Sequence, residues 1–312
     1  MERKDFLKGA VVASLATALD FSGLNKVLAS NKTVTQSDAQ NNLVAVMGGE
    51  PVEMFEKMLA EMGGIKKFVS AGDRVVIKPN IGWAKTPDMG ANTNPDLVGA
   101  LVKQCVDAGA KDVRVFDHTC NEWTSCYDLS GIKSAVEANG GIMLPGNDES
   151  YYVDVELPEG VKMKKAKIHK ALEECDVWFN VPILKVHGGA KMTISMKNYM
   201  GIVWDRTYLH ETDLQQCIAD ACTYHKKPAL HIVDAYRVMK ANGPRGKSIE
   251  DVVVTKGLFA SSDPVAVDVA ALKFFAQVKE MNLSDVAHIE LGEKLNLGTT
   301  DLTKVNIKRI KI

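Results

Sequence analysis

Strand-like and helix-like segments alternate along most of the chain, and this order constrains the fold more than any other feature of the sequence. Short runs rich in Val, Ile and Phe are each followed by a loop and a longer run of helix-forming residues. The strand-like runs include 43–47, 74–78, 112–116, 176–181, 229–233 and 252–260, and the helical runs include 95–108, 131–139, 213–224 and 264–279. This alternation predicts an α/β fold with a mainly parallel sheet and helices on both faces.

One segment interrupts the alternation. Residues 141–168 are poorer in helix-forming residues and are typical of short antiparallel strands. We therefore expect a single α/β domain over residues 43–312 that carries a small antiparallel insertion at 141–168.

The first thirty residues have the layout of an export signal. Basic residues at Arg3, Lys4 and Lys8 precede an Ala-rich apolar run, and the small residues near Ala29 are typical of a cleavage site. The segment "RKDFLK" resembles a twin-arginine signal in which Lys4 replaces the second arginine. The prediction is removal of 1–30, a linker at 31–42, a periplasmic or otherwise extracytoplasmic location, and no stable membrane span after processing. The alternative is an amphipathic N-terminal helix of the domain.

Composition and missing motifs exclude several classes of function. The formal net charge is -1, from 38 basic and 39 acidic residues, so the chain is not expected to bind nucleic acid. The sequence has no Gly-x-Ser-x-Gly serine elbow and no Gly-x-Gly-x-x-Gly dinucleotide loop. We therefore expect neither a serine hydrolase of that type nor a conventional nicotinamide enzyme.

Polar residues follow the strand-like runs at the points where the strands should end. They are Lys78 and Asn80; Asp117 and His118; Lys185 and His187; and Asp234. Ligands of open parallel sheets bind at the carboxyl ends of the strands, so these residues predict one cleft at that edge.

The stretch "NVPILKVHGGAKMTISMKNYMG", residues 180–201, is expected to form one wall of this cleft. Lys185 and His187 are the predicted catalytic residues, because Lys and His can act as acid and base. The side chains predicted to bind the ligand are Lys78, Asn80, Lys191, Lys197, Asn198 and Asp234. Lysines favour a small anionic ligand, whereas the alternative is a basic loop that is simply solvated.

The loop after 112–116 is the predicted metal site. His118, Cys120 and Cys126 are residue types that bind zinc, nickel or iron, although the cofactor stays open beyond a transition metal. The alternative is a disulfide between Cys120 and Cys126, which an oxidising compartment would favour. The other cysteines, Cys105, Cys175, Cys217 and Cys222, are expected to be buried apolar residues.

The sequence also predicts where four further histidines lie. We expect His231 to be structural, because it lies within an apolar strand, and His225 and His288 to lie on the surface. His210 follows the 180–201 stretch closely, so it is expected to face the same cleft with Asp205 and Arg206.

Several segments, taken in order, resemble the domain-of-unknown-function family numbered 362. They are "VVIKPN", "TNPDLVGALVKQCVDAGAKDVRVFD", "NVPILKVHGGAKMTISMKNYMG", "ALHIVDAYRVMKANGP" and "FASSDPVAVD". The resemblance implies one α/β fold and a cleft shared by these segments. Many members of that family look like iron–sulfur proteins with a ferredoxin-type extension, whose cysteines are not found in this sequence. The family is also distantly similar in layout to the nickel-pincer lactate racemases.

Three functions are consistent with these features. The first is an exported, metal- or cofactor-dependent protein, redox- or isomerase-linked, that acts on a small anionic ligand and has a redox partner protein. The second is a metal-free Lys/His enzyme that acts on a carboxylate or phosphate. The third is a non-catalytic protein that binds an anion.

Overall fold

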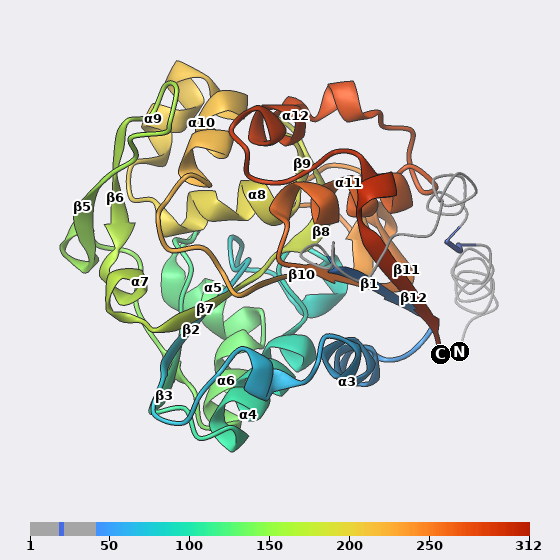
Figure 1. Cartoon of the computed structure of the whole chain (residues 1–312), viewed down its shortest axis with the longest axis horizontal. Helices are drawn as coiled ribbons and strands as arrows, with labels where there is room; N and C mark the ends of the chain where they lie inside the picture. Colours follow the sequence, from blue (N-terminus) through green and yellow to red (C-terminus); the bar gives the residue numbers. More distant parts are fainter. Residues whose placement is uncertain (1–18, 22–41) are drawn as a thin grey trace.

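The computed structural model describes residues 19–21 and 42–312 (Figure 1). The predicted export signal at 1–30 and linker at 31–42 therefore lie almost wholly outside the described residues, and they stay predictions. No helix in the described part of the chain is long and apolar enough to cross a membrane.

A ten-stranded sheet forms the centre of the described part. Its main order is β12-β1-β11-β10-β7-β2-β3-β4, with β8 paired to β10 and β9 paired to β8. Its strands are β1 (Asn42–Met47), β2 (Arg74–Pro79), β3 (Asp112–Val115), β4 (Ile142–Met143), β7 (Val177–Val181), β8 (Ile183–His187), β9 (Lys191–Thr193), β10 (Leu230–Met239), β11 (Val252–Ser261) and β12 (Asn306–Lys311). Most pairs are parallel, and the antiparallel pairs of this sheet involve β11 and β9. The prediction of a mainly parallel sheet is confirmed.

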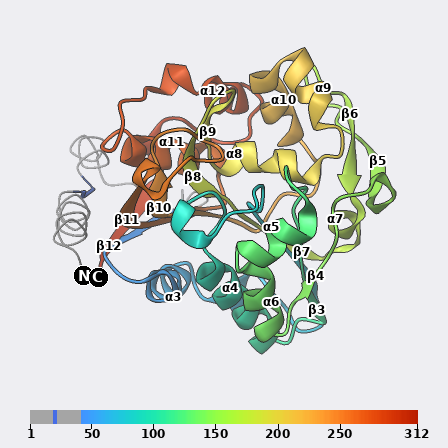
Figure 2. The same cartoon turned by 180° about the vertical axis from the view of Figure 1, so that it is seen from behind.

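Helices cover both faces of this sheet (Figures 1 and 2). The helices are α3 (Pro51–Glu61), α4 (Pro95–Asp107), α5 (Trp123–Leu129), α6 (Ile132–Ala138), α7 (Lys170–Glu174), α8 (Ser195–Asn198), α9 (Arg206–Thr212), α10 (Leu214–Ala221), α11 (Pro264–Phe275) and α12 (Ala287–Lys294). Alternate residues of each strand point to opposite faces. Leu43 and Ala45 of β1 therefore join the core under α10, α11 and α12, whereas Val44 and Val46 join the core under α3 and α4.

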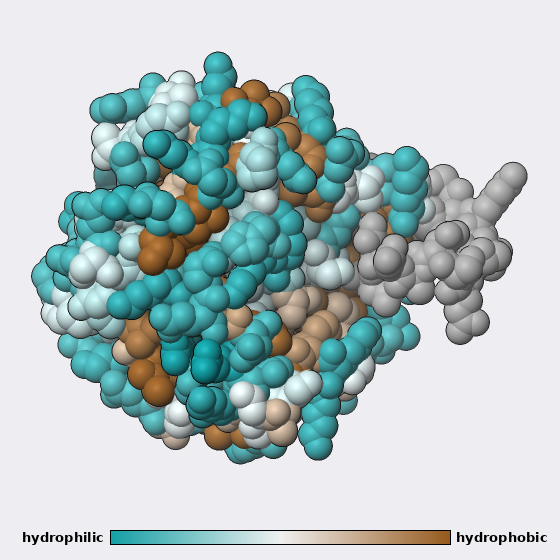
Figure 3. Space-filling model, turned by 60° about the vertical axis from the view of Figure 1, so that its left-hand side comes forward, coloured by the Kyte–Doolittle hydropathy of each residue, from teal (hydrophilic) through white to brown (hydrophobic). Residues whose placement is uncertain are grey.

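The predicted antiparallel strands form a separate two-stranded sheet of β5 (Tyr152–Glu156) and β6 (Lys165–His169), whereas β4, which also lies within 141–168, pairs in parallel with β3 in the main sheet. The turn between the two strands is held by Asp220 of α10, which accepts hydrogen bonds from the N–H groups of Val161, Lys162 and Met163 at 2.9, 2.7 and 2.8 Å. This side of the molecule is mainly hydrophilic, with small separate hydrophobic patches (Figure 3).

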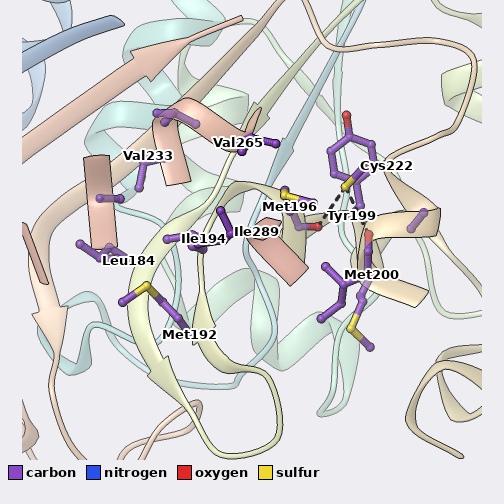
Figure 4. Close-up of a cluster of buried hydrophobic side chains, with 14 of the residues drawn as sticks. Leu184, Met192, Ile194, Met196, Tyr199, Met200, Cys222, Val233, Val265 and Ile289 are labelled. Atoms are coloured by element: carbon purple, nitrogen blue, oxygen red, sulfur yellow. Dashed lines mark hydrogen bonds between the residues drawn. The ribbon is translucent and has the colours of Figure 1, made fainter. Parts of the chain in front are cut away.

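In the β8–β9 hairpin, apolar and polar side chains point to opposite faces. Leu184, Met192 and Ile194 are fully buried in the hydrophobic cluster around Val233 and Ile289 (Figure 4). Lys185 lies opposite Thr193 in the antiparallel register, and neighbouring residues of a strand point to opposite faces. The apolar residues therefore anchor the hairpin, and Lys185 and Thr193 are left to face the other way.

Candidate active site

A cleft of about 1140 Å³ opens at the carboxyl ends of β2 and β3 and beside the β8–β9 hairpin. Its walls come from these strands, from α8, from the β5–β6 insertion and from α9. Six of the residues predicted to share one cleft line it: Lys78, Asn80, Lys185, His187, Lys197 and Asn198. The predicted neighbours Asp205, Arg206 and His210 line it too. The lining carries eight Lys or Arg side chains and four Asp or Glu side chains, a composition that favours an anionic ligand.

A buried ion pair lies on one wall of the cleft. This wall, formed by the residues at the ends of β2 and β3 with Asn198 of α8, is here called the inner wall. Lys78 at the end of β2 and Asp117 after β3 are 1% and 3% exposed, and Lys78 Nζ lies 2.8 Å from Asp117 Oδ1. The second oxygen of Asp117 accepts a hydrogen bond from the N–H of Ile81 at 2.6 Å. Burial lowers the pKa of Lys78, and the Asp117 carboxylate opposes this effect. Gly201 makes room for the pair, because a Cβ there would lie 1.9 Å from Asp117 Oδ1 and 2.4 Å from Lys78 Nζ.

Asn198 of α8 joins this ion pair to the rest of the inner wall. Its Oδ1 accepts hydrogen bonds from Lys78 Nζ at 2.7 Å and from Asn80 Nδ2 at 3.2 Å. Its Nδ2 donates to Asn180 Oδ1 at 2.8 Å and to the carbonyl of Lys78 at 3.2 Å. Every hydrogen-bonding position of this amide is therefore used, which fixes the orientations of Lys78 and Asn80.

The amine of Lys185 is buried in the wall of the cleft. It is 1% exposed, and it donates hydrogen bonds to Asn80 Oδ1 at 3.0 Å and to the carbonyl of Ala91. Burial, with a further effect from the positive charge of Lys197, lowers its pKa to about 7. An uncharged amine has two hydrogens and one lone pair. The two hydrogen bonds therefore satisfy the neutral form and leave its lone pair free to accept a proton.

Two neutral histidines line the cleft in opposite tautomers. His187 Nδ1 accepts a hydrogen bond from the N–H of Ala190 at 3.1 Å, so its Nε2 carries the proton and acts as a donor. His118 Nδ1 lies 3.1 Å from the carbonyl of Val203, so it donates its proton there and leaves Nε2 as an acceptor. Burial is the main cause that lowers the two pKa values, to about 2 for His187 and about 4 for His118.

Arg206 fixes the turn that carries His118 and Cys120. Its Nη1 donates to the carbonyl of His118 at 2.9 Å and to Cys120 Sγ at 3.4 Å, and its Nη2 donates to the carbonyl of Thr119 at 2.7 Å. The ring of His118 also stacks on Trp204, with centroids 5.0 Å apart. The loop after β3 is thus ordered by α9 and the residues before it.

The structure does not assemble the predicted metal site. His118 and the exposed Cys120 line the cleft, but Cys126 is fully buried and does not line it. Burial raises the pKa of the Cys126 thiol to about 11, which disfavours a thiolate ligand. Within residues 19–21 and 42–312, no group of three His, Cys, Asp or Glu side chains could hold a metal ion. Cys120 and Cys126 are also not linked, since all six cysteines are free; the four others are buried as expected.

Three further residues do not lie where the sequence predicted them. Lys191 is exposed at the start of β9, outside the residues that line the cleft. Asp234 is buried within β10, where its carboxylate accepts hydrogen bonds from the N–H groups of Asn94 and Tyr236 at 2.8 and 2.9 Å. The prediction of a surface position for His288 is wrong: it is fully buried, because α12 packs against α10 and its ring contacts Gln215. His231, expected to be structural, is buried and contacts Ser195 and Asn180.

Sequence reasoning missed the polar residues that support the site from behind. Asn180 is fully buried, and its Nδ2 donates to the carbonyl of Ser195 at 2.9 Å. Asp268 in α11 accepts hydrogen bonds from the N–H groups of Ser195 and Met196 at 2.8 and 2.9 Å, so it fixes the start of α8. The available signal was a polar residue with apolar residues on both sides of it in a strand or helix.

The fold and the cleft define an open α/β protein whose polar residues gather at the carboxyl ends of parallel strands. The family model described as "Domain of unknown function (DUF362)" matches residues 75–273, which is more than half of the chain. The chain belongs to this family.

Two known proteins are similar to the chain. It is 24% identical over 266 residues to the "Thylakoid-associated protein sll1697" of Synechocystis sp., a match that covers 81% of this chain and 77% of that protein. The solved lactate racemase apoprotein from Thermoanaerobacterium thermosaccharolyticum is similar with a TM-score of 0.48 and 13% identity. That match covers 79% of this chain and 60% of the racemase chain, so this chain spans less than two thirds of the racemase's length.

Proposed function

We propose that the cleft binds a small carboxylate or phosphate and that Lys185 removes a proton from it without a metal. The observation that carries this proposal is the bonding of the Lys185 amine, which satisfies the neutral form and leaves one lone pair unused. A pKa of about 7 gives comparable amounts of the free base and its conjugate acid near neutral pH, which is the best range for proton transfer. The Nε2–H of His187 would donate to the negative charge that develops on the ligand.

Hydrogen–deuterium exchange tests this proposal without knowledge of the full reaction. Small carboxylic acids and phosphate esters are incubated with the protein in D2O, and the loss of C–H signals is followed by proton NMR. We expect exchange in at least one compound, with a fall of about 10²–10⁴-fold in the Lys185→Met variant. Lys103→Met is the matched control, because Lys103 is exposed on α4.

The titration of Lys185 gives an independent measure. In protein labelled with ¹³C at lysine, the signal that disappears in Lys185→Met should titrate with a midpoint of about 7, whereas exposed lysines titrate near 10.4. A midpoint above about 9.5, or exchange that is equally fast in Lys185→Met, would remove Lys185 from the proposed role.

The cofactor-dependent function is the second candidate, and the size of the cleft favours it. A volume of about 1140 Å³ exceeds what a small anion fills, so a larger organic cofactor would fit beside one. In this candidate the protein acts with a redox partner and is exported, as the first thirty residues suggest. Mass spectrometry of the native protein would test both points. A bound cofactor and a start at Asn31 would support this candidate, and an intact Met1 with no bound cofactor would contradict it.

A further inference from the structure

Two polar groups near Lys185 and His187 of the β8–β9 hairpin lack partners, one in β9 and one in α8. Thr193 is 2% exposed and lines the cleft, and its hydroxyl finds no hydrogen-bond partner among the described residues. Lys197 also lines the cleft, and its ammonium forms no hydrogen bond or ion pair with the part of the chain that the structure describes. A buried hydroxyl without a partner is destabilising, so its presence here calls for a ligand or a function.

A third donor lies on the same side. His187 follows Lys185 by two residues in β8, so the two side chains share one face of the hairpin, and Thr193 lies opposite Lys185. The neutral ring of His187 keeps its proton on Nε2, because Nδ1 is used by Ala190. Lys197 lies close enough for its charge to contribute to the lowered pKa values of both His187 and Lys185.

We propose that Thr193, Lys197 and His187 form a subsite for the carboxylate group of a monocarboxylic acid, beside the Lys185 amine. Thr193 and His187 supply two neutral donors, and Lys197 supplies one positive charge, which matches the single negative charge of a carboxylate. Lys78, the buried lysine at the end of β2, is already neutralised by Asp117. The inference deepens the proposed function, since it places the binding group of the ligand next to the base that would act on it.

Ligand-observed NMR on the full-length protein tests the subsite directly, with acetate as the probe. We expect Lys197→Gln to weaken acetate binding about tenfold or more, because the hydrogen bond to a charged group is lost. Thr193→Val keeps the shape but removes the hydroxyl, so it should weaken binding about two- to tenfold. His187→Phe removes the third donor and should weaken binding by a similar factor. Lys103→Gln, which removes an exposed charge from α4, should leave binding unchanged.

Two outcomes would overturn the subsite. One is acetate binding at wild-type affinity in Lys197→Gln and Thr193→Val when both have folded circular dichroism spectra. The other is tighter binding of inorganic phosphate, measured by phosphorus NMR, with the same dependence on Lys197 and Thr193. Lys185→Met separates the two proposals. If acetate binding persists while exchange is lost, both hold; if Lys197 governs acetate binding but Lys185 proves irrelevant to exchange, only the proposed function fails.

Discussion

Two walls of the same cleft treat their polar side chains in different ways. On the inner wall, Lys78, Asp117 and Asn198 are almost fully buried, and each is paired with other side chains. The second wall, here called the hairpin wall, consists of His187 and Thr193 of the β8–β9 hairpin with Lys197 of α8. On it, the Thr193 hydroxyl and the Lys197 ammonium are unpaired within the described residues. Paired polar groups stabilise one arrangement of the chain, whereas unpaired ones lower stability and suit a ligand. The inner wall therefore stabilises the shape of the cleft, and the proposed carboxylate subsite lies on the hairpin wall.

The largest effect on stability is expected from Asp117→Asn on the inner wall. The substitution leaves the buried Lys78 ammonium without its counter-charge, which should lower the free energy of unfolding by about 3–5 kcal/mol. Urea denaturation measures this change. Asp107→Asn breaks the exposed Lys103–Asp107 pair and should stay within about 0.5 kcal/mol. Equal effects of the two substitutions would show that the inner wall is not held by its ion pair.

Asn198→Ala should have the next largest effect. It removes the amide that bonds Lys78, Asn80 and Asn180, and these buried groups lose their partners, so we expect a loss of about 2–3 kcal/mol. The exposed Asn147→Ala serves as the control, with an expected change within about 0.5 kcal/mol. A small effect at Asn198 would mean that water replaces the amide, contrary to a closely bonded inner wall.

Lys185 links the two walls, and its titration predicts a pH dependence of stability. Its pKa is about 7 in the folded chain and 10.5 for the ordinary group, so the unfolded chain binds more protons between these values. The contribution of Lys185 to the free energy of unfolding therefore rises as the pH rises from about 7 to 10.5. Over this window the wild-type free energy of unfolding should rise relative to Lys185→Met by about 1.4 kcal/mol per pH unit. Parallel curves for the two proteins would contradict the lowered pKa.

The smallest effect should have the opposite sign and come from the hairpin wall. Thr193→Val replaces an unpaired buried hydroxyl with a methyl group of similar size, so the free energy of unfolding should rise by up to about 1 kcal/mol. Thermal denaturation of the two proteins without ligand gives the comparison. A clear loss of stability would show that the hydroxyl has a partner, and the contrast between the two walls would then fail.

Part of the candidate site follows from local sequence. The polar residues at 78–80 and 185–187 come directly after apolar runs, and parallel strands align their carboxyl ends, so these groups share one cleft. Asp234 also follows an apolar run, but it does not line the cleft. Its carboxylate accepts hydrogen bonds from the N–H groups of Asn94 and Tyr236 instead. The position of a residue after a strand predicts that it lies at the edge of the sheet. It does not predict which backbone groups form hydrogen bonds with its side chain.

The sequence by itself determined the α/β alternation, the mainly parallel sheet, the small insertion and the gathering of lysines near one edge. Periodicity and strand-end position carry this information, because they depend on residues close together in the chain. Only the tertiary structure decided that Asp117 neutralises Lys78, that Asp268 fixes α8 and that Thr193 stays unpaired. These facts depend on contacts between elements that are far apart in the chain. Burial also depends on such contacts, and it lowers the pKa of Lys185 to about 7, far below that of an exposed lysine.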